Sequence, residues 1–466
     1  MSDNLPGGPY WQVDLGNGTT APWYMLPFDK SGKCTAPKTR ENLLSDVASG
    51  NFSHVVIFSH GWNNDWEAAS ARYHRFINGF QKMRKDHGLK AAPAYRPLLV
   101  GIHWPSTALV MPWERAPKFA GQNADLSRRD AAIDQESREI DEIADAVEPD
   151  DRDAFYAIVR KGAPLTETET QKLAELVLPL YQRAQRADDD VRPSSGASAM
   201  TADDLVQVWA GAARDQSTTI SETDDDGFST GPSNATSASP RSAGLLQKLD
   251  PRNIVRTLTV YQMKDRAATI GARGLGPLLT EMLSGPKPAR VHLVGHSYGA
   301  KVVLSGLSQV KEGAAKADSV LLLQPAVNGW CFAGNVNNRN YPGGYQRVLD
   351  RVRQPILTTY TKNDSPLTKF FHLAVRRRDD LGELRVAMAG RPKPPNEFGA
   401  LGGFGPAGLA DSDCQFIDLK PVGESYDLTQ PLKVWALNGD ATIRSHGEVE
   451  IPETYWALYN QITHLS

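Results

Sequence analysis

The chain has 466 residues, of which 40% are hydrophobic and 23% are charged, and its formal net charge is −3. This composition is typical of a soluble globular protein, and the small net charge argues against a general affinity for nucleic acid or anionic membranes. No apolar run approaches the roughly 18 residues that span a bilayer, and residues 1–8 lack the basic and apolar stretches of a secretory signal. We therefore expect a cytoplasmic protein without a transmembrane segment.

Three cysteines occur at wide and irregular spacing, at Cys34, Cys331 and Cys414. An odd number at such spacing favours reduced thiols over a disulfide framework or a zinc site. We expect them to be small, buried or half-buried side chains, and we expect no metal.

The N-terminal part, residues 1–109, has the pattern of a sheet with covering helices. In chain order the pattern predicts a hairpin within residues 8–30, a helix from Thr39 as N-cap to Gly50, a buried strand over 54–58, an amphipathic helix from the N-cap Asp65 to Gly88, and a buried strand over 97–104. The amphipathic helix is expected because apolar residues recur every three or four positions, as on one face of a helix packed on a sheet.

The middle of the chain, residues 110–255, predicts an insertion, because it is far longer than the about 10–15 residues that a crossover helix requires. Its helix-like stretches lie around 130–147, 152–161, 166–187 and 201–214. Residues 216–243 are rich in Ser, Thr, Asp, Gly and Pro and offer little to bury, so we expect them to be disordered.

The C-terminal part, residues 256–466, returns to alternating helices and strands. It predicts a helix over 267–283, strands over 291–294, 319–323, 355–361 and 433–438, and a helix that begins near Ala300. Buried strands that alternate with helices predict an α/β fold with a mainly parallel sheet covered on both faces. The glycine-rich stretch 399–408 lacks the Lys-Ser/Thr of a phosphate-binding loop and follows no strand, so we assign it no nucleotide role.

One motif in this part indicates covalent chemistry. Residues 295–299 read Gly-His-Ser-Tyr-Gly, between a predicted strand and a predicted helix. This is the Gly-x-Ser-x-Gly nucleophile elbow, in which a strained turn exposes the serine hydroxyl above the sheet. The pattern is weak alone and specific in this context, and it makes Ser297 the candidate nucleophile.

A serine hydroxyl needs a base and an orienting acid, which follow the nucleophile in the order Asp or Glu, then His. Asp364 follows the strand that ends at Thr361, and His446 follows the last predicted strand. We expect Ser297 to attack an acyl carbonyl, His446 to transfer the proton, and Asp364 to hold the imidazole. Asp440 also follows the last strand and remains an alternative acid, and the other candidate bases are His372 and His464.

The oxyanion of such a reaction needs backbone donors near the nucleophile. The candidates are the N–H of Tyr298, directly after Ser297, and the N–H of Trp62, in the loop after the strand over 54–58. Losing one such donor costs on the order of 3 kcal/mol of transition-state stabilisation in other enzymes. His60 and His296 adjoin these positions, and we interpret them as packing or hydrogen-bonding residues.

Three motifs together carry a resemblance to a known family: His60-Gly61-Trp62-Asn63-Asn64, Trp104-Pro105-Ser106 and Gly295-His296-Ser297-Tyr298-Gly299. The chain resembles the bacterial serine-esterase, lipase-like branch of the α/β-hydrolase superfamily, whose members combine a His-Gly-aromatic-Asn loop with a Trp-Pro-Ser segment. The resemblance covers residues 54–106 and 258–446, about half the chain. It implies the α/β-hydrolase fold and hydrolysis of a small-molecule or lipid ester without a cofactor.

Several alternatives stay open at the level of sequence. The same triad serves thioesterases, phospholipases and peptidases, and a binding protein could keep the fold without turnover. The insertion could be a lid or an interaction surface. Trp104 and residues 108–113 could line an acyl pocket or pack in the core, whereas 376–380 has the pattern of a solvated face. Neither the substrate-binding residues nor the oligomeric state follows from the sequence.

Overall fold

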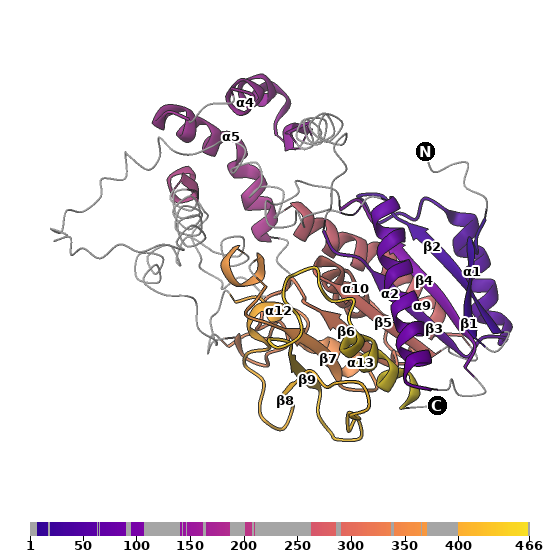
Figure 1. Ribbon diagram of the computed structural model, residues 1–466. Helices are drawn as coiled ribbons and strands as arrows, with labels where there is room; N and C mark the ends of the chain where they lie inside the picture. Colours follow the sequence, from indigo (N-terminus) through magenta and orange to yellow (C-terminus); the bar gives the residue numbers. More distant parts are fainter. Residues whose placement is uncertain are drawn as a thin grey trace, which may run out of the picture.

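A computed structural model gives the arrangement of the chain (Figure 1). The residues that it describes are 7–16, 19–62, 64, 66–89, 95–106, 140–141, 143–145, 147–161, 165–186, 201–206, 209, 262–285, 290–336, 340–364, 366–370 and 399–464. Several predictions concern residues outside these ranges, among them the N-cap Asp65, the disordered stretch 216–243 and the solvated face 376–380.

The described residues form a mixed, mostly parallel sheet of nine strands in the order β1-β2-β4-β3-β5-β6-β7-β9-β8. Only the pairing of β1 with β2 is antiparallel among these strands, which is the predicted hairpin. The strands are β1 (Trp11–Gly16), β2 (Thr19–Pro27), β3 (His54–Ser59), β4 (Pro97–His103), β5 (Arg290–His296), β6 (Ser319–Leu323), β7 (Ile356–Tyr360), β8 (Cys414–Asp418) and β9 (Val434–Asn438). The predicted α/β character with a mainly parallel sheet is therefore present.

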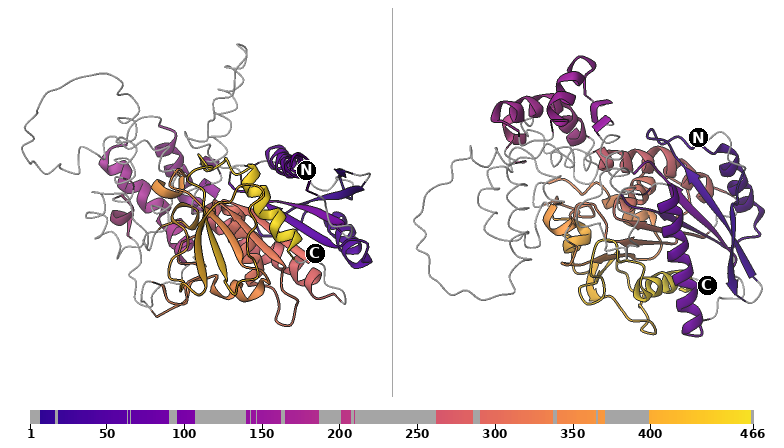
Figure 2. Two further views of the ribbon diagram at one scale, coloured as in Figure 1. Left: turned by 60° about the horizontal axis from the view of Figure 1, so that its bottom comes forward. Right: turned by 45° about the horizontal axis from the view of Figure 1, so that its top comes forward.

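Helices cover both faces of this sheet (Figures 1 and 2). Successive residues of a strand point to opposite faces, and Val55 and Ile57 of β3 pack in one core cluster whereas Val56 and Phe58 pack in the other. The helices α1 (Pro37–Ser49), α9 (Gly276–Leu283) and α10 (Tyr298–Ser308) pack in the first cluster, and α2 (Trp66–Asp86) and α13 (Pro452–Thr463) pack in the second. Such burial on both sides explains why the central strands read as continuous apolar runs.

One strand was not predicted. β8 lies at the edge of the sheet, parallel to β9, between the strands predicted over 355–361 and 433–438. Buried and exposed side chains do not alternate along its five residues, because Gln415, Phe416 and Asp418 are exposed and only Cys414 is buried. An edge strand that buries so little carries no clear period-2 signal.

The predicted start of the first helix was wrong. Pro37 is the first residue of α1 and Ala36 occupies the N-cap, whereas Thr39 lies inside the first turn. Proline suits the first helical position because it has no N–H to satisfy there. The Thr39 hydroxyl instead accepts the Gly8 N–H at 3.1 Å and bonds the Tyr10 hydroxyl at 2.8 Å, so it holds the N-terminal segment on the helix.

The helix before β5 begins earlier than the predicted residue 267. It is helical from Gln262, widens to a π turn, η3 (Ile270–Leu275), and continues as α9. π turns are rare single-turn insertions in α-helices, so a helical period of about 3.6 residues does not predict one. The other short helical elements of the described residues are η2 (Pro149–Asp151), η5 (Gln346–Arg351), η6 (Pro366–Phe370) and α12 (Leu401–Phe404).

Two helices of the predicted insertion are described, α4 (Arg152–Val159) and α5 (Glu167–Arg186). They match the predicted stretches 152–161 and 166–187 and lie outside the layers of the sheet and its covering helices (Figure 2). Side chains of this region, including Phe155, Leu173 and Trp209, form a small core of their own. No helix among the described residues is both long and apolar enough to cross a membrane.

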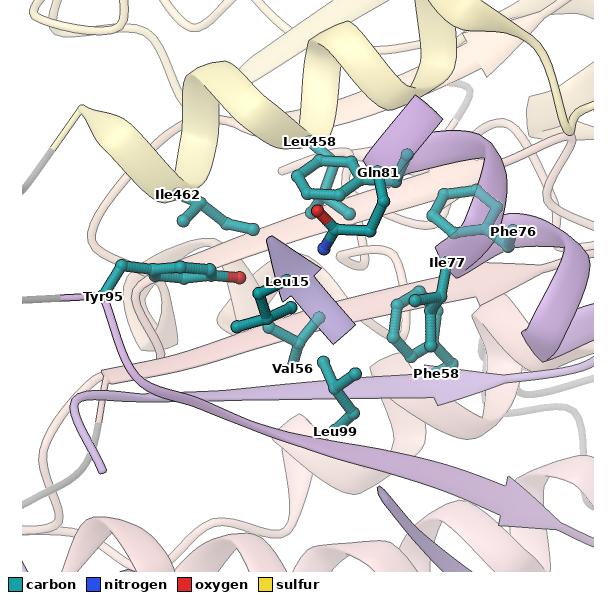
Figure 3. Close-up of a pocket in the computed structure, with 11 residues that line it drawn as sticks. Leu15, Val56, Phe58, Phe76, Ile77, Gln81, Tyr95, Leu99, Leu458 and Ile462 are labelled. Carbon is teal, nitrogen blue, oxygen red and sulfur yellow. The ribbon is translucent and has the colours of Figure 1, made fainter. Parts of the chain in front are cut away.

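A small cavity lies between α2, α13 and the sheet (Figure 3). Its volume is about 20 Å³, its lining is mostly apolar, and Tyr95 and Gln81 contribute the polar groups. A space of this size holds no more than a water molecule. It is therefore a packing defect of this face and no substrate site. The three cysteines are free, with Cys331 and Cys414 buried and Cys34 half-buried, as the sequence predicts.

Candidate active site

Ser297 occupies the turn between β5 and α10 in a backbone conformation that is uncommon for a residue with a Cβ. Its φ is 56° and its ψ is −126°. The strain is held by hydrogen bonds, because the Ser297 N–H donates to Leu323 O at 3.0 Å and the Ser297 carbonyl accepts the Ala326 N–H at 3.2 Å. Leu323 is the last residue of β6, and Ala326 lies in the turn that follows it. The predicted strained elbow is thus present, braced by the neighbouring strand.

The glycine after the elbow is required by close packing. A Cβ at Gly299 would lie 2.1 Å from the Ser59 carbonyl oxygen and 2.5 Å from that of His60. The first turn of α10 therefore packs directly on the end of β3, which only a residue without a side chain permits. This contact brings the loop after β3 to the nucleophile.

His446 and Asp364 lie next to Ser297, although they are distant in sequence. His446 Nε2 is 2.8 Å from Ser297 Oγ, and His446 Nδ1 is 2.7 Å from Asp364 Oδ2. A carboxylate only accepts, so Nδ1 carries the proton and Nε2 accepts the Ser297 hydroxyl. Asp364 is fully buried, whereas 13% of the His446 side chain is exposed. The structure thus brings together the three residues that the sequence selected.

Asp364 is held by further donors, whereas the alternative acid is engaged elsewhere. Asp364 Oδ1 accepts the Leu367 N–H at 3.0 Å, in the turn that begins η6. Asp440 instead accepts the Thr361 hydroxyl at 2.8 Å and the Lys362 N–H at 2.9 Å, and it pairs with the Lys362 ammonium. Between the two carboxylates, the one near His446 is Asp364.

Among the other histidines considered above, those that the structure describes have other hydrogen-bond partners. His372 lies outside the described residues, and His464 follows the last turn of α13, where its N–H donates to Asn460 O at 2.9 Å. His296 Nε2 donates to the carbonyl oxygen of His446 at 2.9 Å. Burial holds the pKa of His296 well below its usual range, so this ring is neutral and serves as a hydrogen-bonding support.

The loop after β3 lies against the nucleophile. A Cβ on Gly61 would lie 2.6 Å from Ser297 Cβ, so the backbone at this position approaches the serine as closely as packing allows. The Trp62 ring packs edge-on against the Tyr298 ring, with centroids 6.4 Å apart. Among the described residues, the Trp62 backbone N–H has no hydrogen-bond acceptor. Tyr298 is the first residue of α10, where helix N–H groups concentrate positive charge.

The Trp-Pro-Ser segment holds this loop in place. His60 Nε2 accepts the Trp104 N–H at 3.3 Å, and the two rings stack with centroids 5.4 Å apart. The Ser106 hydroxyl accepts the Asn64 N–H at 3.1 Å and donates to Asn64 O at 3.0 Å. Burial lowers the pKa of His60 to about 3, so the ring is neutral and accepts at Nε2. Trp104 is thus a core residue, whereas 108–113 lies outside the described residues.

Sequence reasoning missed one residue of this site. Gln324 follows β6, is fully buried and donates its Nε2 to Asp364 Oδ2 at 3.1 Å. A signal was available, because a polar residue directly after the buried strand that ends at Leu323 falls at the same edge of the sheet as the candidate acid.

Comparisons of the chain with protein-family models, with curated proteins and with solved structures find no match. The functional argument therefore rests on the geometry of the site.

Proposed function

We propose that this chain is a serine hydrolase with the α/β-hydrolase fold, similar to bacterial serine esterases, and that it cleaves a carboxylic ester through an acyl-enzyme. One observation carries the proposal: an unbroken hydrogen-bond relay from Ser297 Oγ through the His446 imidazole to the Asp364 carboxylate. Nucleophile, base and orienting acid in this geometry are the parts that serine-dependent acyl transfer requires.

The position of these residues in the sheet supports the same proposal. Ser297 follows the central strand β5, Asp364 follows β7 and His446 follows β9. In α/β-hydrolases the triad has this chain order, and sites of parallel sheets form at the carboxyl ends of the strands. The mostly parallel sheet with helices on both faces is compatible with that fold.

In the first half of the proposed reaction, Ser297 Oγ attacks the ester carbonyl while His446 Nε2 takes the hydroxyl proton. The new C–O bond forms as the carbonyl π bond breaks, and the negative charge goes to the carbonyl oxygen. The N–H groups of Trp62 and Tyr298 are the proposed donors to that oxygen. The intermediate then expels the alkoxide leaving group, which takes the proton from Nε2 and departs as an alcohol.

In the second half, water attacks the acyl-Ser297 carbonyl and gives its proton to His446 Nε2. Collapse of this intermediate releases the carboxylic acid and returns the proton to Ser297 Oγ. Asp364 accepts the Nδ1 proton of His446 in a hydrogen bond and stabilises the imidazolium that forms twice. These side chains account for every bond and proton, so the proposed reaction uses no cofactor.

The test is turnover of p-nitrophenyl esters of graded acyl length by the wild-type protein, Ser297→Ala and Ser319→Ala. Ser319 is a matched control because it is a buried serine that also bonds a histidine, His292, at 2.8 Å. We expect turnover by the wild type and Ser319→Ala, and loss on the order of 10⁶-fold in Ser297→Ala. The acyl length that gives the highest kcat/KM then identifies the substrate class.

A folded wild-type protein that hydrolyses none of these esters would contradict the proposed esterase activity. Turnover confined to thioesters or peptides would reassign the leaving group while keeping the nucleophile. Absence of reaction with all three classes would favour a binding protein that retains the fold.

A further inference from the structure

Gln324 sits at the point where the nucleophile and the acid meet. It directly follows β6, is fully buried, and has a φ of 45°, which is uncommon for a residue with a side chain. Its neighbours in the chain hold the nucleophile, because Leu323 O accepts the Ser297 N–H at 3.0 Å and the Ala326 N–H donates to Ser297 O at 3.2 Å. The turn 323–326 therefore contacts the Ser297 backbone on both sides.

The side chain of the same residue holds the acid. Gln324 Nε2 lies 3.1 Å from Asp364 Oδ2 and 3.2 Å from Gly402 O. Both partners only accept hydrogen bonds, so the nitrogen end of the amide must face them. The oxygen end accepts the Thr359 hydroxyl at 2.9 Å, and Thr359 Oγ1 in turn accepts the Gln324 N–H at 2.9 Å. The amide orientation is thus fixed at both ends.

Asp364 Oδ2 is also the oxygen that receives His446 Nδ1, at 2.7 Å. Two donors, one from His446 and one from Gln324, therefore share a single carboxylate oxygen in a fully buried setting. The amide donor removes the freedom of the carboxylate to rotate away from His446.

We propose that Gln324 is a positioning residue of the triad, which fixes the Asp364 carboxylate toward His446 and, through the turn 323–326, ties that carboxylate to the backbone of the nucleophile. This inference rests on the proposed serine-hydrolase function. Gln324 acts through Asp364 and does not itself touch the reacting atoms.

The test replaces Gln324 by methionine, which has nearly the same shape and no N–H donor. The measurement is the second-order rate of Ser297 labelling by a fluorophosphonate between pH 5 and 9. We expect labelling that is 10- to 100-fold slower at pH 7, because a misplaced reacting group costs about that much. We also expect the acid limb of the profile to move to lower pH, because a carboxylate that can turn away from His446 stabilises the imidazolium less strongly.

The matched control is Gln461→Met. Gln461 is an equally buried glutamine on α13, whose Nε2 donates to Val320 O at 3.0 Å and which bonds no triad residue among those described. Loss of a buried amide at this position should lower the stability and leave both the labelling rate and the pH profile of the folded protein unchanged. A shift of the acid limb separates positioning from a merely structural role.

Thr359 provides a second pair of variants in case Gln324→Met does not fold. Thr359→Val removes the hydroxyl that fixes the Gln324 amide while keeping the shape of the side chain, and Thr359→Ser keeps the hydroxyl. We expect slower labelling and an acid limb at lower pH for Thr359→Val, and nearly wild-type behaviour for Thr359→Ser.

The outcomes separate this inference from the function on which it rests. Failure of the fluorophosphonate to label the folded wild type overturns the proposed function, and the inference with it. Labelling of the wild type together with an unchanged rate and pH profile in Gln324→Met, or in Thr359→Val, overturns the inference alone.

Discussion

The two ends of the sheet both pair histidines with serines, yet only one end has the parts of a nucleophilic site. At the amino end, His54 Nδ1 lies 2.7 Å from Ser53 Oγ and His292 Nδ1 lies 2.8 Å from Ser319 Oγ. At the carboxyl end, His446 Nε2 lies 2.8 Å from Ser297 Oγ. The distances are nearly equal, so proximity of imidazole and hydroxyl does not distinguish the two ends.

The surroundings of the pairs do distinguish them. The two imidazoles at the amino end stack on each other with centroids 5.3 Å apart, and their Nε2 atoms have no hydrogen-bond partner within the described part of the chain. His446 instead has the Asp364 carboxylate behind it. Only Ser297, of the three serines, has a positive φ. The acid behind the histidine and the strained turn at the serine are therefore what distinguish the candidate site from the other Ser–His pairs.

The largest expected effect comes from removing the carboxylate that distinguishes His446 from the two histidines of the amino end. Asp364→Asn removes the carboxylate while keeping the shape, and an amide at this position favours the wrong imidazole tautomer. In the same arrangement elsewhere this change lowers kcat on the order of 10⁴-fold. We expect a loss of this order in steady-state p-nitrophenyl ester turnover.

Asp440→Asn is the control for that variant, because Asp440 bonds Thr361 and Lys362 and does not bond His446. It should retain turnover within a few fold of the wild type. If Asp440→Asn abolishes turnover and Asp364→Asn does not, the assignment of the acid is wrong.

A smaller effect is expected from displacing the loop after β3, which carries Trp62 and has no counterpart beside the serines of the amino end. In Gly61→Ala the new Cβ would lie 2.6 Å from Ser297 Cβ, so the loop that carries Trp62 must shift. Loss of one oxyanion donor costs on the order of 10²–10³ in kcat, and we expect a decrease of this size with KM nearly unchanged. Gly285→Ala is the control, because a Cβ at that position has no atom within 4 Å. Equal kinetics in the two variants would argue against the role given to the loop.

The smallest effect on turnover is expected from substitutions at the amino end, which should change the stability of the protein and leave turnover unchanged. Burial lowers the pKa of His54 to about 4 and that of His292 to about 3. Both rings are neutral in the folded protein, whereas the unfolded chain binds protons below pH 6.5. The contribution of the two neutral rings to the free energy of unfolding is therefore complete above about pH 6.5. It is lost as the pH falls, by about 1.4 kcal/mol per pH unit for each ring.

The variant His292→Asn keeps a polar atom near Ser319 and removes one of these titrations. Urea unfolding between pH 7 and pH 4.5 should show a shallower loss of the free energy of unfolding with falling pH than in the wild type. Ester turnover at pH 7.5 should be unchanged. An identical pH slope, or a loss of turnover, would show that the two ends are not independent in this way.

The sequence predicts the parts of the fold that burial specifies. The central strands appear as apolar runs and the elbow as a strand-turn-helix motif, so Ser297 can be selected without coordinates. The edge strand β8 escapes prediction because it buries little, and the cap of α1 was misassigned because Thr39 bonds the distant Gly8 and Tyr10.

The candidate site likewise has residues that the sequence predicts and residues that only the fold shows. Chain order narrows the acid to Asp364 or Asp440, and only the fold shows that Asp440 is bonded to Lys362 instead of His446. The support from Gln324 depends on a turn with φ of 45° and on bonds to Thr359 and Gly402. These contacts connect distant segments, and no local pattern records them.

The nucleophile is identified most directly by locating a fluorophosphonate adduct on the intact protein with tandem mass spectrometry. We expect a single adduct on the peptide that contains Ser297, and none on the peptides that contain Ser53 and Ser319. A folded protein that stays unlabelled, or an adduct on either serine of the amino end, would contradict this expectation.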